Sequence, residues 1–532
     1  MKEIAFASAT KLAALIRQKK IGSLELLELY LKRIEAFNPG LNAIVALDVE
    51  RARKDAALMD RRLARGDIAG PLHGVPMTVK ESFDVEGLPT TWGDPAQADN
   101  IAKEDALAVA RLRAAGAVVF GKTNVPLMLA DWQSYNAVYG QTNNPWDHAR
   151  SPGGSSGGSA AALAAGLTGL ELGSDIGASI RNPAHYCGVY GHKPTWGICS
   201  PRGHGLGTLG ETDMSVIGPL ARGGADLMTA LDVIAGPDEI DSAGWKVSLP
   251  KPRLPGIKGL KVAIMSDCPV APVDEEYAKK IEALARTFKK EGAKVDLAAR
   301  PEVDWAELWR TYILLLRAAT SMRLSDEQAA FWAEEARKFG EASDDYVALM
   351  ARGNTLPHRL WLRLNETRLK IRRAFAAFFR EWDVLLCPVA ATAAVPHDQE
   401  GQRHERTILV NGQPQPVTTQ LFWAGIATLA YLPATVAPIG AMKGGLAHRR
   451  ADHRGAVSGP PSHPSRDPHG EGRARLPRPS GLRGRRSAPA FPGEGGGGGE
   501  GGGEGGGLSA ARLRLPFALS CRYGWLRPAP LP

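Results

Sequence analysis

Residues 151–182 read SPGGSSGGSAAALAAGLTGLELGSDIGASIRN, and this stretch decides what fold and chemistry the chain supports. It starts as a Gly/Ser loop, continues into an Ala/Leu run that predicts a helix, and ends in a second glycine turn. The first turn presents Ser155 and the second presents Ser179. Small residues let a backbone turn tightly, so successive N–H groups can point at one oxygen atom. Such donors stabilise a negative charge that develops on a carbonyl oxygen.

A lysine upstream of this stretch supplies a candidate base. The segment GVPMTVK, residues 74–80, predicts a short buried strand that ends in Lys80. A serine hydroxyl is a weak nucleophile and needs a base, and a buried lysine becomes one when its pKa falls from about 10.4. Glu81 need not oppose that fall, because neighbours on a strand point to opposite faces. Taken alone, Lys80 and Ser155 are more often structural; together with Ser179 they suggest nucleophilic acyl transfer.

Two other chemistries compete for the same residues. His185 and His192 lie close to Ser179 in the sequence, so a histidine base stays an alternative, although residues 185–188 look more like a packed turn. A phosphate-binding loop needs Gly-Lys-Ser/Thr after its glycines, whereas Ser159 is followed here by two alanines. The phosphate alternative is therefore disfavoured.

Outward from this stretch, helical and strand patterns alternate. Helices are predicted from Ser23 to a stop at Asn38-Pro39-Gly40 and over 49–65, and residues 304–382 are mostly helical. Residues 259–297 form a strand–helix–strand unit. We therefore expect an α/β fold: a single large domain, 1–446, with a mixed, largely parallel central sheet covered by helices.

The net charge of +9 does not indicate a nucleic-acid partner. From Leu446 onward the chain holds 14 Arg, no Lys and 6 acidic residues, a net of +8, which leaves +1 for everything before it. Residues 447–532 are rich in Arg, Gly and Pro and lack apolar periodicity, so we expect a disordered tail. Five cysteines without paired spacing, no long apolar run and no leader-like N-terminus predict a cytoplasmic protein without a membrane partner.

Longer motifs resemble one known family. The strings GGSSGGSAAALAAG (153–166) and GSDIGASIRNPAHYCGVYGHKPT (173–195) are similar to the amidase signature family. The upstream strings GVPMTVKESFDVEGLPTTWG and GKTNVPLM match that family's other blocks. The resemblance covers roughly residues 5–446.

The resemblance implies a Ser–cis-Ser–Lys triad, with Ser179 as nucleophile, Ser155 as bridging serine and Lys80 as base. It also implies an amide hydrolase without metal or cofactor. The implied oxyanion donors are the backbone N–H groups of Ile176, Gly177 and Ala178; the supporting residues are Asp175, Arg181 and Ser156. Many members carry glycine where this chain has Ala178, whose methyl group demands a negative φ more strongly and narrows the acyl site.

The implied substrate is a small-molecule amide, and a homodimer is the oligomeric expectation. The alternatives are the glutaminase subunit of a tRNA-dependent amidotransferase, which needs partner subunits, and an inactive homologue. Aromatic side chains in the variable middle region suggest an apolar acyl or aryl group, but core packing explains them equally well: Trp305, Trp309, Tyr312, Phe331 and Trp332.

The family pattern breaks after Leu446. Residues 434–440 (ATVAPIG) and 444–446 (GGL) fit, and the family continues with a buried strand such as IGVQIIG and a closing helix. Here the chain reads AHRRADHRG, residues 447–455. These residues can be encoded so that a frame one base later translates as Pro-Ile-Gly-Val-Gln-Ile-Ile-Gly. We therefore expect a frameshift near Leu446, with a natural disordered tail as the alternative.

Overall fold

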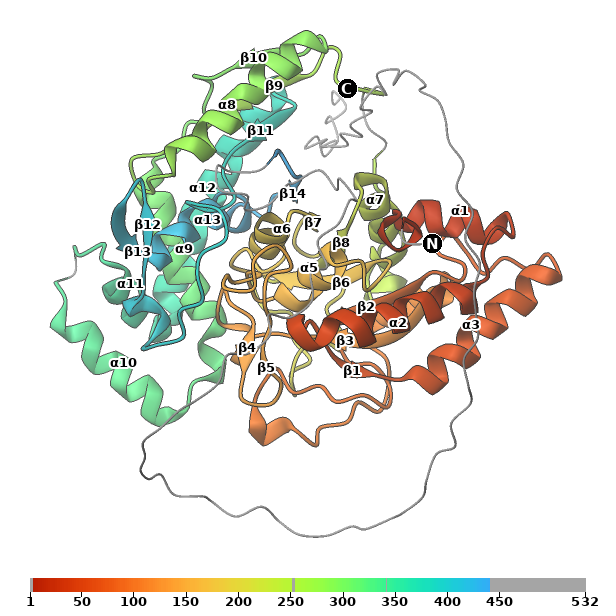
Figure 1. Ribbon diagram of the computed structural model, residues 1–532. Helices are drawn as coiled ribbons and strands as arrows, with labels where there is room; N and C mark the ends of the chain where they lie inside the picture. Colours follow the sequence, from red (N-terminus) through yellow and green to blue (C-terminus); the bar gives the residue numbers. More distant parts are fainter. Residues whose placement is uncertain (1–2, 251–253, 341, 441–532) are drawn as a thin grey trace, which may run out of the picture. The chain divides into compact units, whose positions relative to one another are not determined.

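The computed structural model describes residues 3–250, 254–340 and 342–440 (Figure 1). The predicted tail at 447–532, and with it the frameshift, lie outside these residues. The helices agree with the predicted pattern. They are α1 (Ala9–Arg17), α2 (Ser23–Leu41), α3 (Val49–Ala64), α4 (Leu107–Ala114), α5 (Gly157–Ala164), α6 (Arg181–Cys187), α7 (Gly224–Ile234), α8 (Glu275–Lys290), α9 (Trp305–Thr320), α10 (Asp326–Lys338), α11 (Tyr346–Asn354), α12 (His358–Glu381) and α13 (Leu421–Leu429).

The strands form three sheets and two short hairpins. The sheet orders are β1-β3-β2, β14-β7-β8-β6 and β10-β9-β11. The strands are β1 (Ile44–Leu47), β2 (Pro76–Lys80), β3 (Val118–Thr123), β4 (Tyr135–Asn136), β5 (Gly140–Gln141), β6 (Glu171–Asp175), β7 (Tyr190–Lys193), β8 (Val216–Ala221), β9 (Lys261–Ile264), β10 (Lys294–Asp296), β11 (Val384–Leu386), β12 (Thr407–Val410), β13 (Gln413–Pro416) and β14 (Ala434–Val436).

The expected α/β class is confirmed, and the pairing refines the expected sheet. Parallel pairing joins β2 to β3 and joins β9 to both β10 and β11. The four-stranded sheet is antiparallel throughout, because β8 pairs antiparallel with β6 and β7, and β7 with β14. The helical pattern and short buried strands were visible in the sequence, whereas strand direction depends on the connections between distant segments.

Strands β2 and β6 lie side by side and bring the segment of Lys80 close to the segment of Asp175. The N–H of Thr78 on β2 donates to Thr168 Oγ1 over 3.0 Å, and the N–H of Gly169 donates to the Pro76 carbonyl over 3.1 Å. Lys80 ends β2 and Asp175 ends β6. Two segments almost 100 residues apart in the chain therefore end at the same place.

Helix α2 differs from its predicted end. It continues through Pro39 to Leu41, and Gly22 rather than Ser23 occupies the N-cap. The helix stops at Asn42, which adopts a left-handed conformation with φ of 50°. Pro39 removes one helical N–H but does not end the helix. The left-handed residue Asn42 does, three residues later than predicted.

Two large apolar clusters form most of the core, beside two small ones. The first gathers the N-terminal helices with β2 and β3, and the second gathers β9, α8, α9, α12 and α13. The turn after β6 that carries Ser179 joins them, because Ala178 belongs to the second cluster and Ile180 to the first, both fully buried. Among the described helices, none is both long and apolar enough to cross a membrane.

Candidate active site

Lys80 is fully buried and its amine faces two serines. Its Nζ donates to Ser155 Oγ over 2.6 Å and to Ser174 Oγ over 2.9 Å. Burial lowers the pKa of Lys80 to about 7, and the charges of Asp175 and Glu81 oppose this fall only in part. An amine with this pKa is largely neutral just above neutral pH, which is the form that accepts a proton.

Glu81 follows Lys80 in the chain, but its carboxylate binds the loop at residues 91–92. Its carboxylate accepts the N–H groups of Thr91 and Trp92 over 2.5 and 3.0 Å, and the hydroxyl of Tyr139 over 3.2 Å. The carboxylate is therefore hydrogen-bonded away from the amine, as the alternation of side chains along a strand predicts, although its charge still opposes part of the fall in the pKa of Lys80.

The loop that carries Ser155 is fixed by close backbone packing. The peptide bond between Gly154 and Ser155 is cis. A Cβ on Gly154 would lie 2.4 Å from the Asp131 carbonyl oxygen, so only glycine fits there. Gly153 has φ of 87°, in the left-handed region that favours glycine. The glycines seen in the sequence thus permit a close approach to residues 131–132.

An ion pair braces the turn that carries Ser179. The Asp175 carboxylate accepts the N–H groups of Ala178 and Ile180 over 3.1 and 3.0 Å, and the guanidinium of Arg181 over 2.8 Å. Although burial raises it, the pKa of Asp175 is held below its usual value by Arg181. Arg181 also donates to the Ala424 carbonyl on α13 over 3.0 Å. The turn is thereby tied to α13.

Two aromatic side chains orient the peptide groups of this turn. The Tyr312 hydroxyl donates to the Ile176 carbonyl over 3.1 Å, and Trp132 Nε1 donates to the Gly177 carbonyl over 2.7 Å. Because N–H and C=O point in opposite directions across a peptide plane, these bonds also set the direction of the following N–H groups. Within the described residues, the N–H groups of Ile176 and Gly177 meet no acceptor, whereas that of Ala178 is taken by Asp175.

Ser179 itself is 7% exposed. Its carbonyl accepts the N–H of Ser156 over 3.1 Å, which ties the two serine turns together. No hydrogen bond of its Oγ occurs among the described residues. The structure therefore shows the Lys80–Ser155 hydrogen bond, and the backbone contact from Ser156 holds the Ser179 turn beside it.

Ala178 has a positive φ of 72°. The expectation that its methyl group would enforce a negative φ is therefore wrong. The left-handed conformation costs an L-residue about 1–2 kcal/mol. It is held by the hydrogen bond from the Ala178 N–H to Asp175 and by the hydrogen bonds to the Ile176 and Gly177 carbonyls.

Substitution of Ala178 by glycine should change stability by less than about 1 kcal/mol. Relief of about 1–2 kcal/mol of strain is offset by about 0.8 kcal/mol of lost methyl burial and by the greater entropy of an unfolded glycine. Ala178→Val should cost about 3 kcal/mol or more, because a branched side chain is disfavoured at positive φ and overfills the cluster. Urea denaturation of both variants checks this, and equal losses would contradict it.

The histidine alternatives find other partners. A ring nitrogen of His185 lies 2.9 Å from the Thr392 carbonyl, and Nδ1 of His192 lies 2.8 Å from Thr435 Oγ1. Burial lowers the pKa of His192 to about 4. These hydrogen bonds direct a ring nitrogen of each histidine toward Thr392 or Thr435, which favours the lysine base.

Two residues of the site, Ser174 and Trp132, were missed in the sequence analysis. Ser174 was visible as a polar residue inside a buried strand directly before Asp175, and so had a local signal. Trp132 had none, because it lies in an irregular segment far from either turn. Of the five aromatic residues noted in the middle region, Tyr312 contacts the catalytic turn, while Trp305 packs on Phe422.

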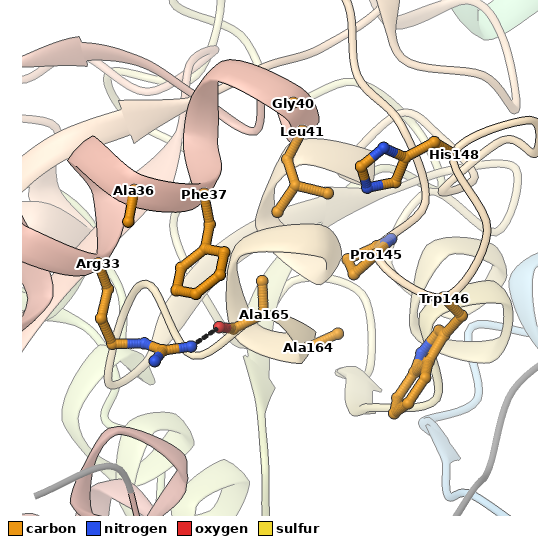
Figure 2. Close-up of a pocket in the computed structure, with 10 residues that line it drawn as sticks. All are labelled: Arg33, Ala36, Phe37, Gly40, Leu41, Pro145, Trp146, His148, Ala164 and Ala165. Carbon is orange, nitrogen blue, oxygen red and sulfur yellow. Dashed lines mark hydrogen bonds between the residues drawn. The ribbon is translucent and has the colours of Figure 1, made fainter. Parts of the chain in front are cut away.

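A separate hollow of about 370 Å³ opens beside α2, α5 and the loop at 145–148 (Figure 2). Its arginine, Arg33, donates to the Ala165 and Gly166 carbonyls over 2.7 and 2.8 Å and lies over the ring of Phe37. None of the catalytic candidates lines this hollow, so it does not form part of the site.

Comparison with known proteins identifies the family of the chain. A family model described as Amidase matches residues 25–447. An acylamidase from Rhodococcus erythropolis is 35% identical over 398 residues, which cover 73% of this chain and 80% of the relative. One subunit of the glutamyl-tRNA(Gln) amidotransferase from Geotalea daltonii is 33% identical over 401 residues, covering 71% of this chain and 81% of the relative.

A solved structure supports the fold. The crystal structure of a bacterial aryl acylamidase of the amidase signature family superimposes with a TM-score of 0.68 at 24% identity, covering 82% of this chain and 91% of that one. The family match extends over most of the chain and includes both serine turns and Lys80. The chain therefore belongs to the amidase signature family, and its activity is hydrolysis of amide C–N bonds.

Proposed function

We propose that the chain hydrolyses its amide through an acyl-enzyme on Ser179, with Ser155 as the bridging serine and Lys80 as the base. The observation that carries this proposal is the 2.6 Å contact between Lys80 Nζ and Ser155 Oγ, made by a buried amine whose pKa is about 7. A neutral amine at this distance accepts the Ser155 proton, while Ser174 stays within hydrogen-bond reach of the same nitrogen.

The proposed reaction runs in two halves. Ser179 Oγ attacks the amide carbon as its proton passes to Ser155 Oγ, and the Ser155 proton passes to Lys80 Nζ. The tetrahedral oxyanion is bound by the N–H groups of Ile176 and Gly177. The C–N bond breaks, and the leaving nitrogen takes a proton back through Ser155, so ammonia or an amine departs. Water then cleaves the Ser179 ester by the same relay in reverse, releasing the carboxylic acid.

The assignment of Lys80 predicts how activity depends on pH. Because the base form is neutral, kcat/KM should rise about tenfold per pH unit up to about pH 7 and level off above it. With an ordinary lysine pKa of about 10.4, kcat/KM would instead keep rising up to about pH 10. A pH profile of kcat/KM on one neutral amide measures the limb directly.

Lys193 provides the control for this profile. It is also fully buried, and burial together with Arg181 lowers its pKa to about 7, but its Nζ donates to the Pro194 and Leu432 carbonyls. The limb near pH 7 should persist in the Lys193→Met protein. Loss of the rise in kcat/KM near pH 7 in Lys193→Met would count against Lys80 as the base. So would a rise that continues above pH 9 in the unsubstituted chain.

We propose a small-molecule amide as substrate and the cytoplasm as the place of action. The glutaminase-subunit alternative requires partner subunits for useful turnover. Assay of the isolated chain distinguishes the two, because a free-standing amidase turns over without a co-purifying partner.

We also propose that the reading frame changes near Leu446. The family match ends at residue 447, where the composition changes to Arg, Gly and Pro. Strand β14 ends shortly before this point and forms one edge of the four-stranded sheet, with β7 on its other side. An exposed strand edge offers unpaired N–H and C=O groups to a further element. Resequencing the gene tests the frame itself.

A further inference from the structure

Two arginines lie close together near the turn that carries Ser179. Arg317 lies in the last turn of α9, and Arg403 begins a short helix at Arg403–Glu405; we call them the arginine pair. Neither guanidinium forms an ion pair in the part of the chain that the structure describes. Burial, and then the charge of Arg403, lowers the pKa of Arg317 to about 9. Keeping two cations together in a half-buried place is unfavourable without an anion, so the arrangement calls for one.

The carboxylates around the arginine pair have other partners. Asp131 forms an ion pair with Arg406 over 2.7 Å. Asp345 accepts the N–H of Val347 over 2.8 Å at the start of α11, and Glu405 accepts the N–H of Gln402 over 2.7 Å. Each acidic group thus completes a local cap or pair. The charge of Asp131 also acts on Arg403, whereas no carboxylate among the described residues offsets the charge of Arg317.

The polar groups that the arginine pair presents are donors. The Tyr346 hydroxyl accepts from Arg317 Nη2 and, over 3.3 Å, from Arg403 Nη2. With both lone pairs used, this hydroxyl keeps its hydrogen for a further acceptor. Arg317 Nε is buried and meets no acceptor among the described residues. A cluster of donors on two planar guanidiniums matches a carboxylate, whose two oxygens accept in one plane.

Short contacts connect the arginine pair to both catalytic turns. Arg403 Nη1 donates to the Ala130 carbonyl over 2.9 Å. The backbone of Asp131 and Trp132, which follow Ala130, packs against Gly154. Trp132 in that segment donates to the Gly177 carbonyl. On the other side, α9 carries both Arg317 and Tyr312, which donates to the Ile176 carbonyl, and α11 with Tyr346 packs against α9 (Figure 1).

We propose that Arg317, Arg403 and Tyr346 form a carboxylate subsite of the active site, so that the preferred substrates are amides carrying a carboxylate. This inference rests on the proposed amide hydrolysis and names its substrate class. The three side chains bind and orient the substrate's carboxylate; they take no part in the proton relay.

Matched substrate pairs test the subsite on the full chain. Glutaramate and pentanamide have the same chain length and differ in the terminal carboxylate, which lies on the acyl side. N-acetyl-β-alanine and N-propylacetamide make the same comparison with the carboxylate on the amine side. We expect kcat/KM to favour the anionic member of at least one pair about 10- to 100-fold, the range of a charge-assisted hydrogen bond.

The Arg317→Gln protein should lose about 10- to 100-fold in kcat/KM on the preferred anionic amide, with KM carrying most of the change, and less than threefold on the neutral partner. Arg310→Gln is the matched control on the same helix, because Arg310 is paired with Asp344 at the surface and should leave both rates unchanged. Circular dichroism checks that each variant is folded. Equal losses on both members of a pair, or no anionic preference in the parent chain, would overturn the subsite.

Direct binding separates this inference from the proposed reaction. In the Ser179→Ala protein, titration calorimetry with glutarate should show binding that Arg317→Gln weakens about tenfold or more. Hydrolysis of neutral amides without glutarate binding would refute the subsite and leave the reaction intact. Glutarate binding that depends on Arg317, in a parent chain that hydrolyses no amide, would refute the reaction instead.

Discussion

The Ser179→Ala protein should form no acyl-enzyme and should lose nearly all of its amide hydrolysis. Removal of Oγ deletes the atom that attacks the carbonyl, and nothing else in the turn replaces it. The loss should be at least about 10⁴-fold in kcat, because groups that act as one nucleophilic unit fail together. Amine release, followed with a chromogenic anilide, measures it, and intact-mass spectrometry should find the acyl adduct in the parent chain alone.

Ser200→Ala is a matched control for this loss. Ser200 is 8% exposed, close to the 7% of Ser179, but lies outside the two catalytic turns. Its removal should leave kcat within about twofold, in line with a substitution away from the site. The folded state of Ser179→Ala should persist, since its Oγ contributes no hydrogen bond in the described structure. Retained turnover in Ser179→Ala would refute the nucleophile.

A chain whose frame is restored after Leu446 should be markedly more stable than the present one. The restored strand, Pro-Ile-Gly-Val-Gln-Ile-Ile-Gly, adds four large aliphatic side chains. Burying each contributes about 1.5–3 kcal/mol, an upper estimate that is comparable with a whole net stability of about 5–15 kcal/mol. At about 2.1 cal/mol/K of unfolding entropy per residue, each kcal/mol moves the Tm of so long a chain by about 1 °C, so we expect a rise of about 5–10 °C.

Differential scanning calorimetry of three proteins measures this effect: the present chain, the frame-restored chain and a chain ending at Leu446. The truncated chain controls for removal of the Arg-rich segment without addition of a strand. The proposal requires the restored chain to melt above the truncated one. Equal melting temperatures of the restored and truncated chains, or an intact frame in the resequenced gene, would refute the frameshift proposal.

Much of this structure follows from local sequence rules. The helices at 49–64 and 275–290 carry Asp48 and Asp274 as N-caps and show regular apolar spacing, so their positions were predictable. The two serine turns were predictable from their glycines, since a close backbone approach excludes any side chain at Gly154. Ser155 and Ser179 of the proposed triad were predictable from these turns, and Lys80 from the short apolar strand that it ends.

The remainder depends on contacts between distant segments. That β2 lies beside β6, and so places Lys80 near Ser174, comes from hydrogen bonds across about 90 residues of chain. Trp132 reaches the Gly177 carbonyl from a segment with no periodic signal. The φ of Ala178 was mispredicted, because intrinsic preference was outweighed by the Asp175 carboxylate that holds its N–H. Each case is tertiary structure overriding a local rule.

The catalytic turn joins the two apolar clusters, with Ile180 in one and Ala178 in the other. Amide hydrolysis should therefore be lost as soon as the less stable of the two clusters opens. If the second cluster opens by local fluctuation, Tyr312 and α13 release the turn while β2, β6 and the Lys80–Ser155 contact stay folded. In rising urea, turnover should fade before the bulk unfolding signal changes, and amide protons of α9 and α13 should exchange faster than those of β2 and β3.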